Sequence, residues 1–159
     1  MTTLAVTSAG TKIYICATAN TGSTPIPTTH DANATTGFPS LSYTEITQIS
    51  TIGIAGDTSS MVSFMPVNDS QTYKFKSNVN SGVLTLKGAF APSDPGQALL
   101  AAGAAGNSPN SYAFKLALSN GSFMYANGII MNYTTDVGTV AQIMGMDSSV
   151  EMSGGWVRV

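Results

Sequence analysis

Apolar and polar residues alternate along most of the chain, in short runs separated by Gly, Asn, Asp, Ser and Pro. Successive side chains of a strand point to opposite faces, so this period of two is typical of half-buried β-strands. Over residues 82–90, for example, Leu84 and Leu86 share one face while Thr85 and Lys87 share the other. The pattern predicts strands over residues 12–19, 41–55, 60–65, 72–76, 82–90, 111–118, 123–133, 137–146 and 151–159.

Asn120 and Gly121 stand between two of these strands and predict a β-hairpin over residues 111–133. An Asn-Gly pair can supply both positive-φ positions of a type I′ turn.

One short helix interrupts the strands, over residues 95–105. Asp94 is a suitable N-cap, Pro95 fits the first helical position, and Gln97 can reach back to the cap. The predicted fold class is therefore mainly β, a two-sheet β-sandwich or barrel-like domain flanked by one short α-helix.

The 159 residues suit a single domain. Three segments are rich in Thr, Gly and Pro, a composition that gives them little tendency to become ordered in an isolated subunit. They are an N-terminal arm (1–10), a long loop (20–39) and a C-terminal strand or arm (153–159). We expect neighbouring subunits to order them, although Trp156 and Val157 are equally compatible with a place in the chain's own core. The candidate inter-subunit residues are His30, Asp31, Trp156 and Val157.

Charged residues make up only 9% of the chain, whereas Ser and Thr together number 39. The net charge is −2, and the few basic residues are scattered, so no footprint for tight nucleic-acid binding is present. A surface with so little like-charge repulsion suits an obligate assembly. The start MTTLAVTSAG lacks the features of a signal peptide, and polar residues interrupt the uncharged stretch 116–135, so we expect a cytosolic product without a membrane span.

Candidate chemistry is sparse. The chain has one Cys and one His, and it lacks the motifs of nucleophile elbows, phosphate loops, paired metal-binding histidines and calcium loops. Cys16 lies in an apolar strand, where a buried structural thiol is expected. We therefore expect no enzyme, no cofactor and no metal. Several Met residues in strands indicate adaptable packing or subunit contacts: Met61, Met65, Met124, Met131, Met144 and Met146.

Four stretches give the chain a resemblance to a known family. In chain order they are YTEITQISTIGIAGDT, GVLTLKGAFAPSDPGQALLAA, the hairpin AFKLALSNGSFMYANG and the closing MSGGWVRV. In order and length they resemble the major tail tube proteins of long, non-contractile-tailed bacteriophages.

The resemblance implies a virion protein assembled in the host cytoplasm, with six copies in a ring and rings stacked into a tail tube. Strands of neighbouring subunits would join into an inner barrel around a channel, through which DNA passes without specific binding. The other partners implied are the tape measure, terminator and distal tail proteins. Because bound phosphates would trap DNA, we expect the channel wall to be net negative. The lumen-facing candidates are Glu45, Asp57, Asp136 and Asp147.

Two other classes of function are compatible with a β-rich domain. One is a β-sandwich adhesin, head-decoration protein or carbohydrate-binding module, which would use the Thr- and Asn-rich loops for binding. The other is an enzyme with Ser or carboxylate chemistry, for which the sequence shows no paired catalytic groups.

Overall fold

The computed structural model describes residues 7–19, 37–53, 55–107 and 109–159. Within them the chain forms one α-helix, one short 3-10 helix and two sheets, as the sequence predicts for a mainly β domain. The elements are β1 (Lys12–Cys16), η1 (Phe38–Ser40), β2 (Tyr43–Ile46), β3 (Ile49–Ile52), β4 (Thr58–Phe64), β5 (Tyr73–Asn80), β6 (Val83–Ala89), α1 (Pro95–Ala104), β7 (Ser111–Ala117), β8 (Phe123–Asp136) and β9 (Gly145–Arg158).

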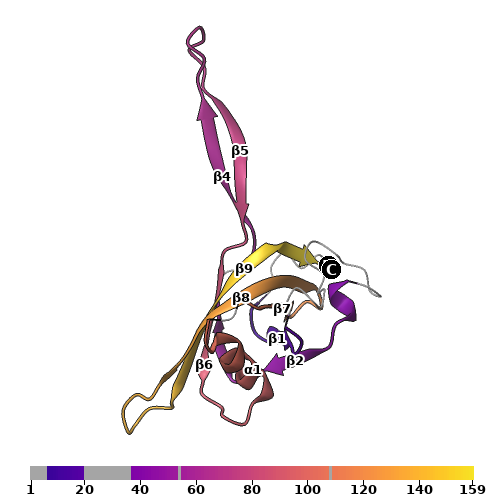
Figure 1. Cartoon of the computed structure of the whole chain (residues 1–159), viewed down its shortest axis with the longest axis vertical. Helices are drawn as coiled ribbons and strands as arrows, with labels where there is room; N and C mark the ends of the chain where they lie inside the picture. Colours follow the sequence, from indigo (N-terminus) through magenta and orange to yellow (C-terminus); the bar gives the residue numbers. More distant parts are fainter. Residues whose placement is uncertain (1–6, 20–36, 54, 108) are drawn as a thin grey trace.

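Seven strands form one antiparallel sheet in the order β2-β1-β7-β8-β9-β6-β3. Its two edge strands, β2 and β3, are consecutive in the chain and are separated only by Thr47 and Gln48. The three Cα–Cα steps from Ile46, the end of β2, to Ile49, the start of β3, span at most about 11 Å. The edges of a flat seven-stranded sheet would lie about 29 Å apart. The sheet therefore curls on itself until its edges meet at this corner, and the body is barrel-like (Figure 1).

The inside of the curled sheet holds the main hydrophobic core. Inward side chains alternate along each strand, so that Leu84, Leu86 and Val150 have no exposed surface. The other fully or largely buried members include Ile13, Ile15, Ile46, Leu100, Phe114, Ile130, Met146 and Trp156.

Helix α1 packs against β8 and β2 and matches the predicted helix. The carboxylate of Asp94 caps it by accepting a hydrogen bond from the Gln97 backbone N–H at 2.8 Å. The predicted return bond from the Gln97 side chain to the cap is replaced by others. The Gln97 amide donates to the carbonyls of Thr47 (3.1 Å) and Ala89 (2.9 Å). Its oxygen accepts from Ala91 N–H (3.0 Å) and the Tyr133 hydroxyl (3.1 Å).

The predicted single strand over residues 41–55 is wrong, because the chain turns a corner between β2 and β3. Gln48 has φ 60°, the left-handed conformation, which interrupts an extended strand, and Asp94 accepts hydrogen bonds from the Thr47 hydroxyl (2.7 Å) and backbone N–H (3.4 Å). The helix cap therefore also fixes the corner. No local pattern could predict this break, since its cause lies 47 residues away.

The predicted hairpin between β7 and β8 is confirmed, but its turn is not type I′. Among the described non-glycine residues only Gln48 has a positive φ, so Asn120 does not, whereas Gly121 has φ 88°. The bonds Gly121 N–H to Leu118 O (3.0 Å) and Leu118 N–H to Ser122 O (2.9 Å) form a longer turn that closes with a left-handed glycine.

The predicted strands 137–146 and 151–159 also need correction. Residues 137–144 form the loop of a hairpin, and β9 runs unbroken from Gly145 to Arg158 along β8. The period-two pattern continues through this exposed loop, because alternation alone does not say where a strand has a partner.

A smaller cluster lies on the outer side of the β1–β7–β8 part of the sheet, where η1 covers it. Phe38 stacks on Tyr125 with ring centroids 6.0 Å apart, beside the buried thiol of Cys16. Tyr43 donates a hydrogen bond to the Phe38 carbonyl at 2.9 Å, and desolvation by burial raises the pKa of its hydroxyl well above the ordinary value. The 3-10 helix is thereby held on the barrel.

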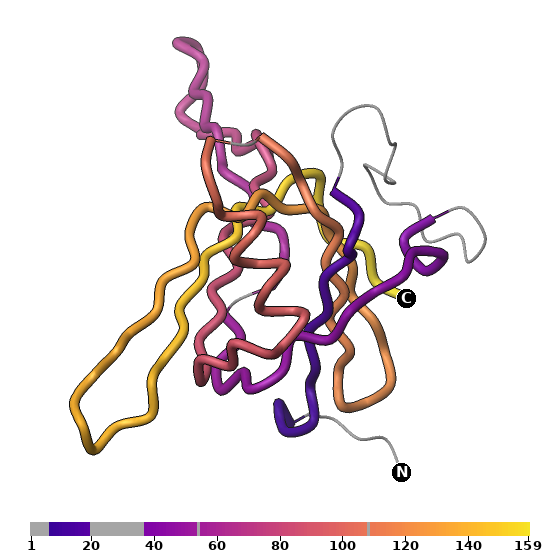
Figure 2. Tube along the Cα trace, turned by 60° about the horizontal axis from the view of Figure 1, so that its bottom comes forward, coloured from indigo at the N-terminus to yellow at the C-terminus, as the bar shows by residue number. Residues whose placement is uncertain are grey.

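Two hairpins project from the body (Figure 1). One is the separate two-stranded sheet β4–β5, which extends far from the barrel. The other is the distal half of the β8–β9 hairpin, seen in orange and yellow in Figure 2, where β8 forms its outer side.

Candidate assembly surfaces

Strands β3, β6, β9 and the distal half of β8 present one outward face that is almost entirely polar. Thr51, Lys87, Asp147 and Thr134 are paired from strand to strand and form one row across it. The next row holds Thr85, Ser149 and Asn132. We call the outward residues of these two rows the polar face.

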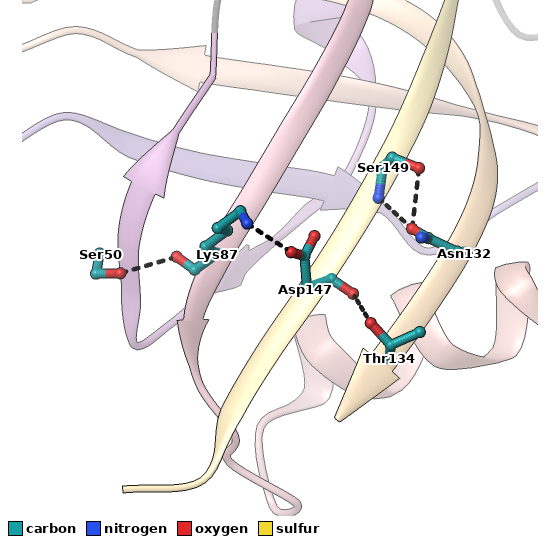
Figure 3. Close-up of polar contacts among 6 residues, drawn as sticks. All are labelled: Ser50, Lys87, Asn132, Thr134, Asp147 and Ser149. Atoms are coloured by element: carbon teal, nitrogen blue, oxygen red, sulfur yellow. Dashed lines mark hydrogen bonds and ion pairs between the residues drawn. The ribbon is translucent and has the colours of Figure 1, made fainter. Parts of the chain in front are cut away.

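Five side chains of the polar face, those of Lys87, Asn132, Thr134, Asp147 and Ser149, bind one another or the sheet backbone (Figure 3). Lys87 Nζ lies 2.8 Å from Asp147 Oδ2, and the Thr134 hydroxyl donates to the Asp147 carbonyl at 3.2 Å. Asn132 Oδ1 accepts from the backbone N–H (2.6 Å) and hydroxyl (2.9 Å) of Ser149. These bonds hold the polar groups close to the sheet.

The ion pair compensates the one basic side chain of the polar face. The hydrogen bond to Asp147, followed by its charge, raises the pKa of Lys87. Both side chains remain well exposed, at 57% and 40%, so the pair adds little to stability. Its consequence is electrostatic: Lys87 is already neutralised and offers little attraction to an anion.

The second surface is the hairpin of residues 58–80, which we call the arm. Almost every residue of β4 and β5 is exposed. An isolated two-stranded hairpin is at best marginally stable in water. The large apolar side chains that the arm exposes are Met61, Val62, Phe64, Met65, Val67, Tyr73, Phe75 and Val79.

The two faces of the arm differ in chemistry. Directly paired residues share a face, and the pairs Val62–Phe75 and Phe64–Tyr73 make one face apolar. The pairs Met61–Lys76 and Ser63–Lys74 lie on the opposite face and carry two of the chain's six basic residues. The apolar face fits a partner that removes it from water.

The base of the arm is fastened to β9. The backbone N–H of Trp156 donates to Asp57 at 3.2 Å, and its indole N–H donates to the Ser81 carbonyl at 3.2 Å. Gly155 N–H donates to the Ser81 hydroxyl at 2.8 Å. Asp57 and Ser81 flank the two arm strands, so Trp156 sets where the arm leaves the barrel.

The four carboxylates predicted to face a lumen are not gathered on one surface. Asp147 lies on the polar face, whereas Glu45 lies on β2 with its Oε2 3.2 Å from Lys12 Nζ. Asp57 lies at the arm base, and Asp136 ends β8 and accepts from Gly138 N–H at 3.0 Å. Their orientation toward a channel stays a prediction.

The inter-subunit candidates fall into two groups. His30 and Asp31 lie outside the described residues, as do most of the N-terminal arm and of loop 20–39. Trp156 and Val157 are 6% and 5% exposed within the chain itself, which matches the core alternative.

The sequence pattern predicts both strands of the arm, but it does not predict that the arm is an exposed surface. The alternation in TYKFK signals one aromatic and one basic face, but only the structure reveals that neither is covered by the chain itself. Of the six Met residues singled out, Met61, Met65, Met131 and Met144 are exposed, whereas Met124 and Met146 belong to the core.

The described residues hold no group of three or more His, Cys, Asp or Glu side chains placed to bind a metal ion. In the same part of the chain, no helix has the length and apolar character needed to cross a membrane.

No protein-family model and no curated protein matches the sequence. Among solved structures, the chain is similar to a chain of the six-fold symmetrised cryo-electron-microscopy structure of the anti-feeding prophage (AFP) baseplate. The TM-score is 0.64 at 13% identity, over 99% of this chain and 97% of that one. A crystal structure of Hcp protein matches with a TM-score of 0.38 at 7% identity, over 89% and 87% of the two chains. The protein thus shares its fold with a chain of the AFP baseplate structure.

Proposed function

We propose that the protein is a structural subunit of a phage-type tail, in which six copies form a ring and rings stack into a tube that conducts DNA. It would act in the virion tail, together with other tail proteins, and by shape rather than by covalent chemistry.

The observation that carries the proposal is the arm. Eight large apolar side chains stand on a hairpin that the chain does not cover. Covering them in contacts between copies would remove this surface from water at about 25 cal/mol per Å². The fold shared with a chain of a six-fold symmetrised assembly favours a ring of six, and the sequence resemblance to tail tube proteins favours stacking.

The polar face is the surface best suited to line a channel. It offers hydroxyl and amide groups, and its one lysine is paired with Asp147. Unpaired basic groups would bind phosphates and release counterions, which would hold DNA at every ring. A neutralised wall lets DNA slide.

Assembly is tested with the purified protein by light scattering and negative-stain electron microscopy. The wild-type protein is expected to form rings and tubes. The double variant Phe64→Ser with Phe75→Ser removes the apolar face of the arm without touching the barrel, and it is expected to remain monomeric or to stop at single rings.

The matched control changes the opposite face of the same hairpin, with Ser63→Asn and Asn78→Ser, and is expected to assemble as the wild type does. A wild-type protein that stays monomeric at high concentration, without rings or tubes in micrographs, would refute the proposal. Equal assembly of the two double variants would show that the arm is not the contact.

A further inference from the structure

The turn that joins β7 to β8 holds an Asn-Gly pair at the surface. Asn120, Gly121 and the preceding Ser119 are exposed, and a Cβ built on Gly121 would meet no atom within 4 Å beyond its chain neighbours. In an Asn-Gly pair the side-chain amide is readily attacked by the next backbone nitrogen, because glycine has no Cβ to block the approach. The sequence holds one other such pair, Asn127 and Gly128.

The side chain of Asn120 folds back over the peptide bond that follows it. Its Oδ1 accepts hydrogen bonds from the backbone N–H of Ser122 at 3.0 Å and from the Ser122 hydroxyl. A bond from Oδ1 to the N–H two residues on is an Asx turn, which keeps the side chain on the side of the intervening Gly121 nitrogen. The two donors also stabilise the negative charge that develops on Oδ1 when a nucleophile adds to the amide carbon.

One hydrogen bond of the turn has to open before the amide can be attacked. The N–H of Gly121 donates to the Leu118 carbonyl at 3.0 Å, so this nitrogen is engaged while the turn is closed. A bond in an exposed turn opens at little cost in free energy, because water replaces the partner and no packed side chain has to move. Gly121 already has φ 88°, and glycine reaches further backbone rotations without a steric penalty.

The second Asn-Gly pair lies in the middle of the seven-stranded sheet. Asn127 is 4% exposed, and Gly128 is paired with Tyr112 on β7 and with Met152 on β9. A Cβ at Gly128 would lie 2.5 Å from a methyl carbon of Val150, so the surroundings pack tightly on this glycine. To bring the Gly128 nitrogen onto the Asn127 side chain, β8 would have to leave both neighbouring strands. The fold therefore opens one Asn-Gly pair to the reaction and protects the other.

We propose that Asn120 is a self-modification site, which the protein converts without an enzyme to aspartate and isoaspartate. The Gly121 nitrogen attacks Cγ of Asn120, the bond from Cγ to the side-chain nitrogen breaks, and ammonia leaves with the proton of the Gly121 N–H. Water then opens the resulting succinimide ring at one of its two carbonyl carbons. Breaking the new N–Cγ bond leaves an ordinary aspartate, whereas breaking the original backbone C–N bond leaves isoaspartate, in which the main chain runs through the side chain.

Either product changes the turn and its charge. Each adds a negative charge to a chain whose net charge is −2 and of which only 9% is charged. Isoaspartate also lengthens the main chain between Leu118 and Ser122, whose bond from N–H to carbonyl at 2.9 Å closes the turn. The hydroxyl of Ser119, beside the reacting residue, donates to the Thr7 carbonyl at 2.6 Å and would be displaced with it. The reaction needs no second copy of the chain, so the inference goes beyond the proposed ring and does not rest on it.

Peptide mapping by mass spectrometry tests the site. The full-length wild-type protein is incubated at mildly alkaline pH, once folded and once unfolded in guanidinium chloride. Loss of the amide is followed at Asn120 and Asn127 in the same samples, since chymotrypsin separates the two pairs by cutting after Phe123 or Tyr125. In the folded protein Asn120 should react at least about tenfold faster than Asn127, because opening β8 breaks more hydrogen bonds than opening the turn. In the denaturant the two rates should agree within about threefold, since both pairs then lie in an open chain.

Two further measurements identify the route. Isoaspartate beside aspartate marks the cyclic intermediate, because direct hydrolysis of the amide yields aspartate alone. Gly121→Asn keeps a residue that tolerates positive φ but places a Cβ beside the attacking nitrogen, so it should slow the loss at Asn120 about tenfold or more. The inference would be overturned by a folded protein that keeps the Asn120 amide while the unfolded protein loses it, or by equal rates at Asn120 and Asn127 in the folded protein. Aspartate without isoaspartate, or a Gly121→Asn variant that reacts as fast as the wild type, would overturn it as well.

Discussion

The side-chain amide of Gln97 joins four parts of the chain, and replacing it should destabilise the whole barrel. In Gln97→Met the shape is nearly kept, but the carbonyls of Thr47 and Ala89, the N–H of Ala91 and the Tyr133 hydroxyl lose their partner. These groups link the corner before β3, the end of β6, the segment that leads into α1 and the distal part of β8. The amide therefore fixes how these four segments lie relative to one another.

The magnitude follows from burial. Gln97 is 1% exposed, and each polar group left unpaired in a buried site costs about 1 to 3 kcal/mol. All four bonds are partly buried, so we take about 1 kcal/mol for each, and the apolar Met side chain offsets about 1 kcal/mol. The expected loss in the free energy of unfolding is about 3 kcal/mol, which lowers the Tm by about 6 to 12 °C in a chain of this size.

Urea unfolding at a concentration where the protein is monomeric measures this loss, with the fluorescence of the single Trp, Trp156, as the signal. Gln71→Met is the matched control, because Gln71 is exposed at the tip of the arm; it should change stability by less than about 0.5 kcal/mol. Tyr133→Phe should cost about 1 kcal/mol alone and almost nothing further in Gln97→Met, since the bond they share is lost only once. A Gln97→Met protein as stable as the wild type would refute the role of the amide.

Two further predictions concern the helix contact and the channel. Gly96→Ala should lower the free energy of unfolding by several kcal/mol, because a Cβ at this position would lie 2.4 Å from the Glu45 carbonyl oxygen. The control is Gly106→Ala, since Gly106 lies in open space with φ 73° and its replacement costs backbone strain alone. Equal losses of unfolding free energy in the two variants, measured by urea unfolding, would contradict the close-contact explanation. Tubes of Asp147→Lys should form normally but retain duplex DNA at low salt and release it at high salt. Tubes of Glu45→Lys, which carries the same charge change away from the polar face, should not retain DNA. Retention by both variants or by neither would refute the polar face as the channel wall.

Local signals in the sequence were sufficient for the elements whose causes are local. The helix follows from Asp94, Pro95 and the apolar run after them, and the structure places the cap where the sequence predicts it. The hairpin 111–133 follows from two alternating runs around Asn120 and Gly121. Composition, with few charged residues and 39 Ser and Thr, indicates a surface poor in charge, and the polar face is built mainly of hydroxyl and amide side chains.

Tertiary structure alone decided which strands are neighbours and which faces are covered. The corner at Thr47 and Gln48 depends on Asp94, far away in the chain, so alternation carried the predicted strand straight through it. The arm has the same alternating pattern as a core strand, and its exposure is visible only once the barrel is seen to close without it. A period of two fixes which side chains share a face, whereas the partner of that face is set by contacts between residues distant in sequence. In this protein the apolar face of the arm is the surface for which the described residues of the chain supply no partner.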